Sequence, residues 1–262
     1  MSTEDDDRLE PLPTGRAASP GRRKAFRVIA TIMAVSGAAF GAFTAVFGAI
    51  AESQRIHALH NSVVATLLLV LSALPALAAA RDPEASTRPL MQLTAVGIAG
   101  LGTMAFSLTI DPFTLPFILL VGVLWSLRPS RQRPNLVERP SPILLVLAVA
   151  AAFPLVMYAL GQAELQRIDR SSEHAELFHW VETSFYSVAI LLVGFLAALA
   201  PAAHRLAAWS AGVALAVLGG ASLVFPERAS ALDGPWGWAA LAGSVVFVGA
   251  AEWERRRLGT AA

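Results

Sequence analysis

Long apolar stretches recur along the whole of this chain and constrain its fold more than any other feature. Each runs for about 17–25 residues, the length that a helix needs to cross a bilayer core of about 30 Å. Only 15% of the 262 residues are charged, against about 25% in a typical soluble domain. The sequence therefore predicts an all-α, polytopic membrane protein that lies in the lipid bilayer.

Eight transmembrane helices account for these stretches. Tight breaks separate them: Asp111 and Pro112 combine a helix-capping residue with a proline suited to the first helical position, and a similar Asp-Gly-Pro break follows residue 232. Residues 1–22 are acidic and then rich in proline, glycine and serine, so a disordered cytoplasmic tail is expected there. The predicted spans are 27–50, 57–80, 90–110, 112–128, 142–161, 178–200, 206–225 and 235–252.

The distribution of basic residues predicts the orientation of the spans. If the N-terminus is cytoplasmic, all but four of the 20 lysine and arginine residues lie in the tail, in the inner loops or after the last span. The four on the outer side are Arg55, Arg167, Arg170 and Arg228. Cytoplasmic segments of membrane proteins carry such an excess. The sequence thus predicts a multi-pass protein of the cell membrane with both termini in the cytoplasm.

A short polar sequence occurs twice and indicates an internal repeat. AESQRI at residues 51–56 and AELQRI at residues 163–168 differ at a single position, and each closes the first span of a four-span group. Because four is an even number, two such halves would share one orientation and be related by an axis along the membrane normal. We therefore expect two parallel four-helix repeats, residues 23–130 and 131–258, with an insertion, DRSSEHAELF, in the second.

A duplicated helix end is a simpler interpretation of the same motif. Glutamate and arginine three residues apart can pair on a helix, and arginine suits the negative C-terminal end of the helix dipole. Exposed pairs of this kind are common and individually weak. This interpretation requires no function for the motif.

Histidines close to these motifs form the candidate functional site. His57 and His60 begin the second span, and His179 and Glu182 begin the sixth. Residues three apart share a helix face, and imidazole with carboxylate on facing helices is a common construction for metal sites in bundles. If both faces turn to the repeat axis, these four side chains converge, and Asp111 can complete the set. The ligand types suit a divalent transition metal such as zinc, iron, manganese or copper, or, through paired histidines, a haem.

Each of these residues also has a plain structural interpretation. They lie at the outer hydrocarbon boundary, where polar side chains cost far less than at the bilayer centre. Asp111 has a sufficient role as an N-cap, and His174, in the acidic insertion, is expected to be solvated. Three classes of function remain open: a protein with an outer-face metal or haem site, a non-catalytic membrane scaffold or assembly subunit, and a small-solute transporter. Transport ranks last, because the predicted spans have no charged residue near the midplane.

Other features of the sequence fit a membrane bundle. Gly37 and Gly41 form a G-x-x-x-G pattern, and the seventh span has a similar small-residue character, which favours close helix packing or assembly into homo- or hetero-oligomers. Tryptophans, Trp180 among them, lie at span ends as interfacial belts do. With no cysteine, disulfides and iron–sulfur clusters are excluded. The basic residues follow the membrane topology, so no nucleic-acid partner is expected.

Overall fold

The structure, a computed structural model, describes residues 19–50, 56–130, 137, 139–200 and 204–259. The fold is 84% helical, and the described residues form no strand, so the predicted all-α class is confirmed. The first copy of the repeated hexapeptide lies outside the described residues except for Ile56, as does the expected tail up to residue 18. The first helix begins at Pro20, within the range expected for the tail.

Among the described residues, seven helices are long and apolar enough to cross a membrane. An eighth apolar helix, α5, has 14 residues and covers only about 21 Å at 1.5 Å per residue. The second span is a continuous rod of α2, a π-helical segment η2, and α3. The elements are α1 (Pro20–Ile50), α2 (Ala58–Thr66), η2 (Leu67–Ala73), α3 (Leu74–Arg81), α4 (Thr87–Ser107), α5 (Thr114–Leu127), α6 (Pro142–Ile168), α7 (Glu173–Glu176), α8 (His179–Leu199), α9 (Arg205–Val224) and α10 (Gly234–Gly259).

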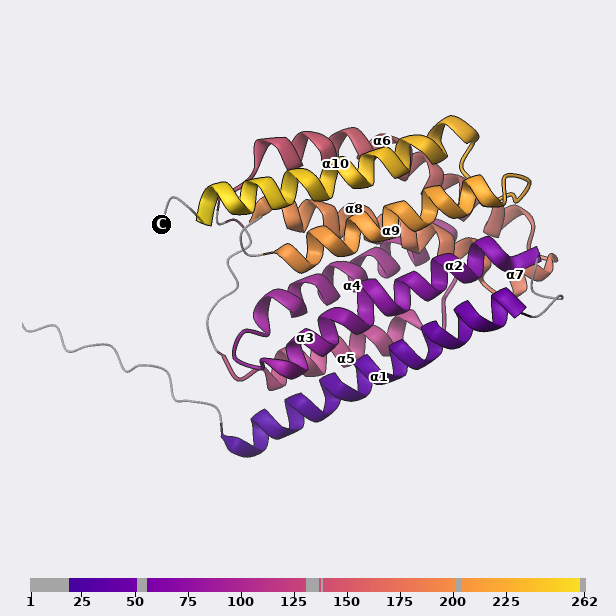
Figure 1. Cartoon of the computed structure of the whole chain (residues 1–262). Helices are drawn as coiled ribbons and strands as arrows, with labels where there is room; N and C mark the ends of the chain where they lie inside the picture. Colours follow the sequence, from indigo (N-terminus) through magenta and orange to yellow (C-terminus); the bar gives the residue numbers. More distant parts are fainter. Residues whose placement is uncertain (1–18, 51–55, 131–136, 138, 201–203, 260–262) are drawn as a thin grey trace, which may run out of the picture.

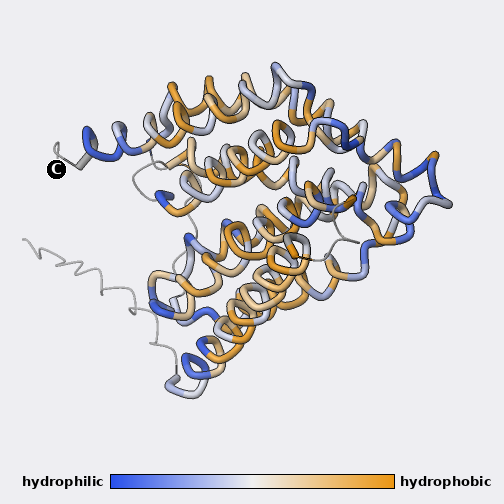
Figure 2. The backbone as a smooth tube through the Cα atoms, turned by 45° about the vertical axis from the view of Figure 1, so that its right-hand side comes forward, coloured by the Kyte–Doolittle hydropathy of each residue, from blue (hydrophilic) through white to orange (hydrophobic). Residues whose placement is uncertain are grey.

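The long helices pack side by side in one bundle, and the chain enters α1 and leaves α10 at the same end of it (Figure 1). We call this the inner end. The short helix α7 and the beginnings of α2 and α8 lie at the opposite, outer end (Figure 1). Hydrophobic residues dominate the middle of the helices, and hydrophilic residues gather at the two ends (Figure 2). This banding fits a bilayer around the middle of the bundle.

Helix α8 is the centre of the bundle. In its most apolar stretch 78% of the residues are buried, compared with 22% in α1 and in α6, whose exposed apolar faces are suited to lipid. The larger core cluster surrounds α8 and includes Tyr186, Val193 and Leu218. A smaller cluster around Phe26 and Leu90 joins α1 to α3, α4 and α5. The outer end of α8 is therefore held from several sides.

Glycines bring neighbouring helices into close contact, as the sequence predicted. A Cβ atom added to Gly41 would lie 2.8 Å from Leu69 Cγ, and one added to Gly219 would lie 2.6 Å from the carbonyl oxygen of Gly237. Both distances are too short for ordinary packing, so a larger residue at either position would displace its neighbour. The partners are helices of the same chain, so an oligomer would need a different surface from these two faces.

The π-helical segment η2 directly precedes Pro75, the second residue of α3. Proline has no N–H to donate and its ring clashes with the preceding turn of an α-helix. A local widening into π-helical turns relieves this conflict without breaking the rod. Helix α6 also contains a proline, Pro154, but remains α-helical.

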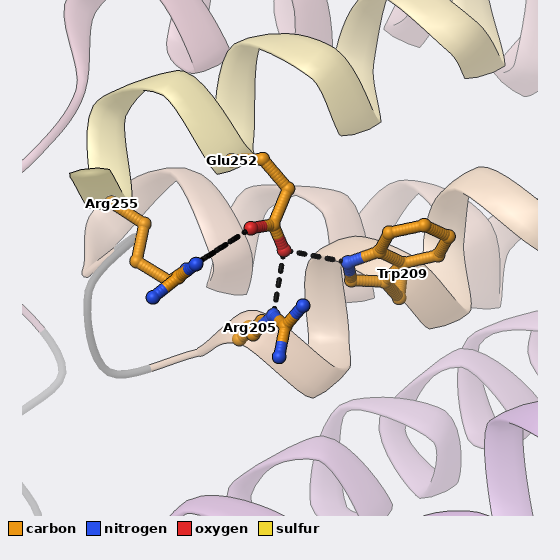
Figure 3. Close-up of polar contacts among 4 residues, drawn as sticks. All are labelled: Arg205, Trp209, Glu252 and Arg255. Atoms are coloured by element: carbon orange, nitrogen blue, oxygen red, sulfur yellow. Dashed lines mark hydrogen bonds and ion pairs between the residues drawn. The ribbon is translucent and has the colours of Figure 1, made fainter.

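At the inner end, a polar cluster ties α9 to α10. Glu252 accepts hydrogen bonds from Arg205 Nε at 2.6 Å, from Trp209 Nε1 at 2.8 Å and from Arg255 at 3.0 Å (Figure 3). All three donors converge on one carboxylate from two helices (Figure 3). Arg205 and Arg255 belong to the basic residues that the sequence assigns to the cytoplasmic side. The cluster positions the last two helices where they leave the apolar zone.

Candidate metal centre

The outer end of the second span presents two buried histidines. His57 is the residue before α2, and His60 lies in the first turn of that helix, so the two are three residues apart. Their exposed fractions are 2% and 7%. Buried imidazoles normally find partners, yet the Nδ1 atom of each has no hydrogen-bond partner among the described residues.

The outer end of α8 presents a third buried histidine. His179 is the first residue of the helix and is 8% exposed, and its Nδ1 also has no partner in the described chain. The residue before it, Phe178, adopts the left-handed conformation with φ 62°. That conformation costs a non-glycine residue about 1–2 kcal/mol, and strained residues of this kind concentrate at functional sites. Phe178 changes the direction of the chain between α7 and α8, so that α8 starts with His179 turned towards α2.

The segment between α6 and α8 supplies a fourth histidine. Ser172 caps the single-turn helix α7 by accepting a hydrogen bond from the Ala175 backbone N–H at 3.2 Å. His174, the second residue of α7, is half-buried. Gln166 of α6 donates to the Ala175 carbonyl at 2.9 Å and anchors the same turn. α7 is thereby fixed against the ends of its neighbours.

The four imidazole rings lie in contact. The rings of His60 and His179 stack with centroids 3.7 Å apart, and His57 meets His179 edge-on at 4.5 Å. His174 lies 4.7 Å from His57 and 5.3 Å from His179, centroid to centroid. His179 is thus the member that touches the other three.

Three of these histidines can serve as a ligand set. One ring nitrogen each from His57, His174 and His179 lies within 4.8 Å of the other two. Burial, and then the neighbouring His57, lower the pKa of His174 below its ordinary value. His174 is therefore neutral at pH 7, and a neutral imidazole has the free lone pair that metal coordination requires.

Two carboxylates contact the rings of His60 and His57. Glu182 Oε2 lies 2.9 Å from His60 Nε2, and the exposed Glu173 places Oε1 3.4 Å from His57 Nε2. Carboxylates that accept from the second nitrogen of a histidine fix its tautomer and orient the ring around a metal. Glu182 therefore contacts the cluster through His60, whereas the sequence analysis assigned it as a direct ligand.

Asp111 has a different position. Its carboxylate accepts hydrogen bonds from the backbone N–H groups of Phe113 at 3.0 Å and Thr114 at 3.1 Å, and from the Thr114 hydroxyl. This is the N-cap arrangement for α5 that the sequence offered as the plain interpretation. Asp111 lines the same cavity as Glu182, but its contacts are with the helix end and not with the histidines.

The structure thus brings together His57, His60, His179 and Glu182 from the sequence-predicted set and leaves Asp111 beside it. Two other expectations from the sequence, for His174 and Trp180, are wrong. His174 is half-buried in the cluster instead of solvated, and Trp180, expected in an interfacial belt, is 5% exposed and stacks on His174 at 4.9 Å. His174 and His179 are five positions apart, a spacing that no regular helix face would indicate. The change of chain direction at Phe178 brings the two rings together.

Comparison with models of protein families found no match, and neither the curated proteins nor the solved structures contain one with significant similarity. The geometry of the site therefore carries the functional argument.

Proposed function

We propose that this chain is an integral membrane protein that binds a divalent transition metal at its outer face through His57, His174 and His179. The observation that carries the proposal is the mutual approach of three ring nitrogens to within 4.8 Å. In a tetrahedral zinc site with bonds of about 2.0–2.1 Å the nitrogens are about 3.3 Å apart, so small side-chain rotations suffice. Three histidines leave a fourth position open to water or another ligand.

A bare ion fits the cluster better than a haem. A haem held by two histidines requires a macrocycle between the two imidazoles. The rings of His60 and His179 stack at 3.7 Å, and the three other ring contacts have centroid distances of 4.5–5.3 Å. These separations leave no space for a macrocycle. Among the ions, imidazole suits zinc, copper, nickel and iron alike, so the ligand set selects a class and not a single element.

Eight spans in two parallel halves remain our proposal for the topology. Helix α4 ends at the outer end of the bundle, and α6 begins at the inner end, where the Ser141 backbone N–H donates to the Ala198 carbonyl at the end of α8. The chain between them, including α5, has to run the length of the bundle. This supports α5 as a short eighth crossing.

The pairing of the helices supports the repeat. In each half the first helix packs on the second and the fourth, and the third packs on the second and the fourth. Between the halves, the second span of each contacts the third span of the other, α2 with α9 and α4 with α8. A twofold axis along the membrane normal, next to α2 and α8, would generate this pattern. Such an axis passes close to the histidine cluster.

Metal analysis of the purified protein tests the proposed function. The protein should bind one equivalent of Zn²⁺ or Co²⁺, and His179→Ala should remove binding because His179 contacts the other three histidines. His204→Asn, at the other end of the bundle, is the matched control and should leave binding unchanged. If the wild type binds neither ion after loading, the metal site is wrong, and a non-catalytic scaffold or assembly subunit becomes the better reading.

The orientation in the cell membrane can be tested separately, because the chain has no cysteine of its own. We propose that α7 and its neighbours are extracytoplasmic and that both termini are cytoplasmic. A membrane-impermeant maleimide should label Arg170→Cys in intact cells, and should label Glu84→Cys only after the membrane is opened. Labelling of both in intact cells would contradict the proposed topology.

Transport is a second candidate, favoured by one cavity. A void of about 100 Å³ is lined by Asp111 and Glu182 at its outer part and by Ser72 in η2. Ser72 lies beyond the middle of the second span, so the cavity extends inward from the carboxylate that holds His60. Liposomes containing the protein would take up Co²⁺ if this cavity is part of a path, and Glu182→Gln would slow that uptake. Binding without uptake would exclude the path.

A further inference from the structure

A second cavity lies at the outer end of the histidine cluster. Its volume is about 240 Å³, and its lining includes His60, His174, Trp180, Glu227 and Arg228. It is smaller than the roughly 300–1,000 Å³ typical of sites for drug-sized ligands. His174, one of the three proposed metal ligands, lines the cavity together with His60, so a molecule in it would lie next to the proposed metal site.

Two residues of the lining carry a buried donor atom that makes no hydrogen bond within the described chain. Trp180 is 5% exposed, and its indole Nε1 has no hydrogen-bond partner among the described residues. Arg228 Nε also has none, although Glu227 Oε1 lies 3.1 Å away. That distance suits charge attraction, but the N–H of Arg228 is not directed at the oxygen. Buried donors are normally satisfied, and a small rotation of either side chain would direct its donor into the cavity that both residues line.

The loop that carries Arg228 is held in place. Ser230 donates to Gln162 Oε1 of α6 at 3.0 Å, and Tyr158 of the same helix donates to the Ser230 carbonyl. At the other side of the loop the Leu232 backbone N–H donates to Ser222 Oγ at 2.9 Å. The backbone that carries Arg228 is therefore largely fixed before any ligand binds, which reduces the cost of binding.

We infer that this cavity binds a small oxyanion, which presents one oxygen to the open metal position and accepts hydrogen bonds from Trp180 and Arg228. This inference rests on the proposed metal site. Because histidine ligands are uncharged, they would not neutralise the charge of a bound divalent ion. A cation and a guanidinium beside one small cavity favour an anion, and the exposed Glu227 at its edge offsets only part of that charge. Carboxylates and tetrahedral anions such as sulfate share the required chemistry, and guanidinium groups bind both.

Cobalt-loaded protein provides the test, because the visible spectrum of Co²⁺ responds to its fourth ligand. Acetate and sodium sulfate are titrated separately, and at least one should give a saturable spectral change; their relative affinities decide between a planar and a tetrahedral ligand. Trp180→Phe keeps a ring against His174 but removes the N–H donor. It should weaken anion binding about tenfold, as expected for one hydrogen bond to a charged acceptor. Arg228→Gln should weaken it by at least as much.

The controls separate the anion pocket from the metal site. Both variants should retain the Co²⁺ affinity of the wild type, and Arg170→Gln, an outer arginine outside the cavity, should retain both affinities. Wild-type protein that binds Co²⁺ but shows no response to either anion would overturn the anion pocket alone. Equal anion affinities in the wild type, Trp180→Phe and Arg228→Gln would do the same. Wild-type protein that binds no Co²⁺ would overturn the proposed function and this inference with it.

Discussion

The outer ends of α2 and α8 share one spacing of polar residues but differ in the residues that surround them. Each presents a histidine followed three residues later by a second polar residue: His60 after His57, and Glu182 after His179. The four meet across the middle of the bundle, with Glu182 on His60 and His179 against both histidines of α2. α8, however, is preceded by the inserted α7, which adds His174 and Glu173.

If α2 and α8 are equivalent helices of the proposed repeat, this difference shows which part of the site a duplication alone would provide. Two equivalent helix ends give a set of rings in contact, but the three nitrogens that approach one another include one from the insertion. The insertion also places the His174 ring against Trp180 of α8. The second half thus carries the features that turn a symmetrical polar contact into an asymmetrical pocket. Substitutions at matched positions of the two halves can test this view.

Within this comparison of the two helix ends, the largest effect is expected from His174→Ala. Loss of a partner outside the ligand set typically lowers metal affinity by 10–100-fold, so loss of a ligand should lower it by about 100-fold or more. Competition for Zn²⁺ with a chromophoric chelator measures the change. Glu176→Ala, an exposed residue of the same short helix, is the control. If His174→Ala retains full affinity while Glu182→Gln loses about 100-fold, the set expected from sequence, with Glu182 as a ligand, is correct.

The next effect concerns packing within the two halves. At Gly219 a new Cβ would lie 2.6 Å from the carbonyl oxygen of Gly237, a backbone atom, whereas at Gly41 the nearest atom belongs to the Leu69 side chain, which can move. Gly219→Ala should therefore reduce stability by about 1–3 kcal/mol, and Gly41→Ala by less. Thermal unfolding in one detergent measures both. Gly161→Ala is the control and should not lower the Tm, because a Cβ at this position would have no atom within 4 Å. Equal losses of stability for Gly41→Ala and Gly219→Ala would show that the two helix contacts are equally rigid.

A smaller effect is expected from Glu182→Gln. The carboxylate lies 2.9 Å from His60 Nε2 and reaches the proposed ligands only through that ring and its stacking on His179. Such indirect support should change metal affinity by about tenfold. Glu164→Gln, in the second copy of the repeated hexapeptide and exposed on α6, should change nothing. A measurable loss of metal affinity at Glu164 would give the hexapeptide a role beyond ending a helix.

The sequence predicted the class of fold and most of the polar cluster. Apolar runs of bilayer length define the helices without reference to tertiary contacts, and the spacing of His57 to His60 and of His179 to Glu182 predicts two helix faces. The pairing of those faces followed from the repeat. These inferences depend on local periodicity, which is a property of the sequence itself.

The remainder depends on chain reversals that carry no periodic signal. His174 joins the cluster because Phe178 adopts a left-handed conformation and because Gln166 fixes the turn of α7. Neither aromatic residues nor glutamine usually mark such positions. Asp111 was ambiguous for a different reason: a carboxylate before a proline suits a helix cap and a metal equally well. Only its hydrogen bonds to Phe113 and Thr114 identify the cap.

The smallest effect is expected from Ser172→Ala, and it tests whether the insertion acts by being ordered in advance. Ser172 Oγ accepts from the Ala175 N–H, and a lost cap of this kind costs about 0.5–2 kcal/mol. α7 has only one turn, so this cost falls directly on the segment that presents His174. Part of the metal-binding free energy must then order α7, and Zn²⁺ affinity should fall by up to about tenfold. Ser171→Ala, its exposed neighbour, should have no effect. If both variants bind Zn²⁺ like the wild type, α7 is held by Gln166 and by its packing, and the cap contributes nothing to the difference between the two halves.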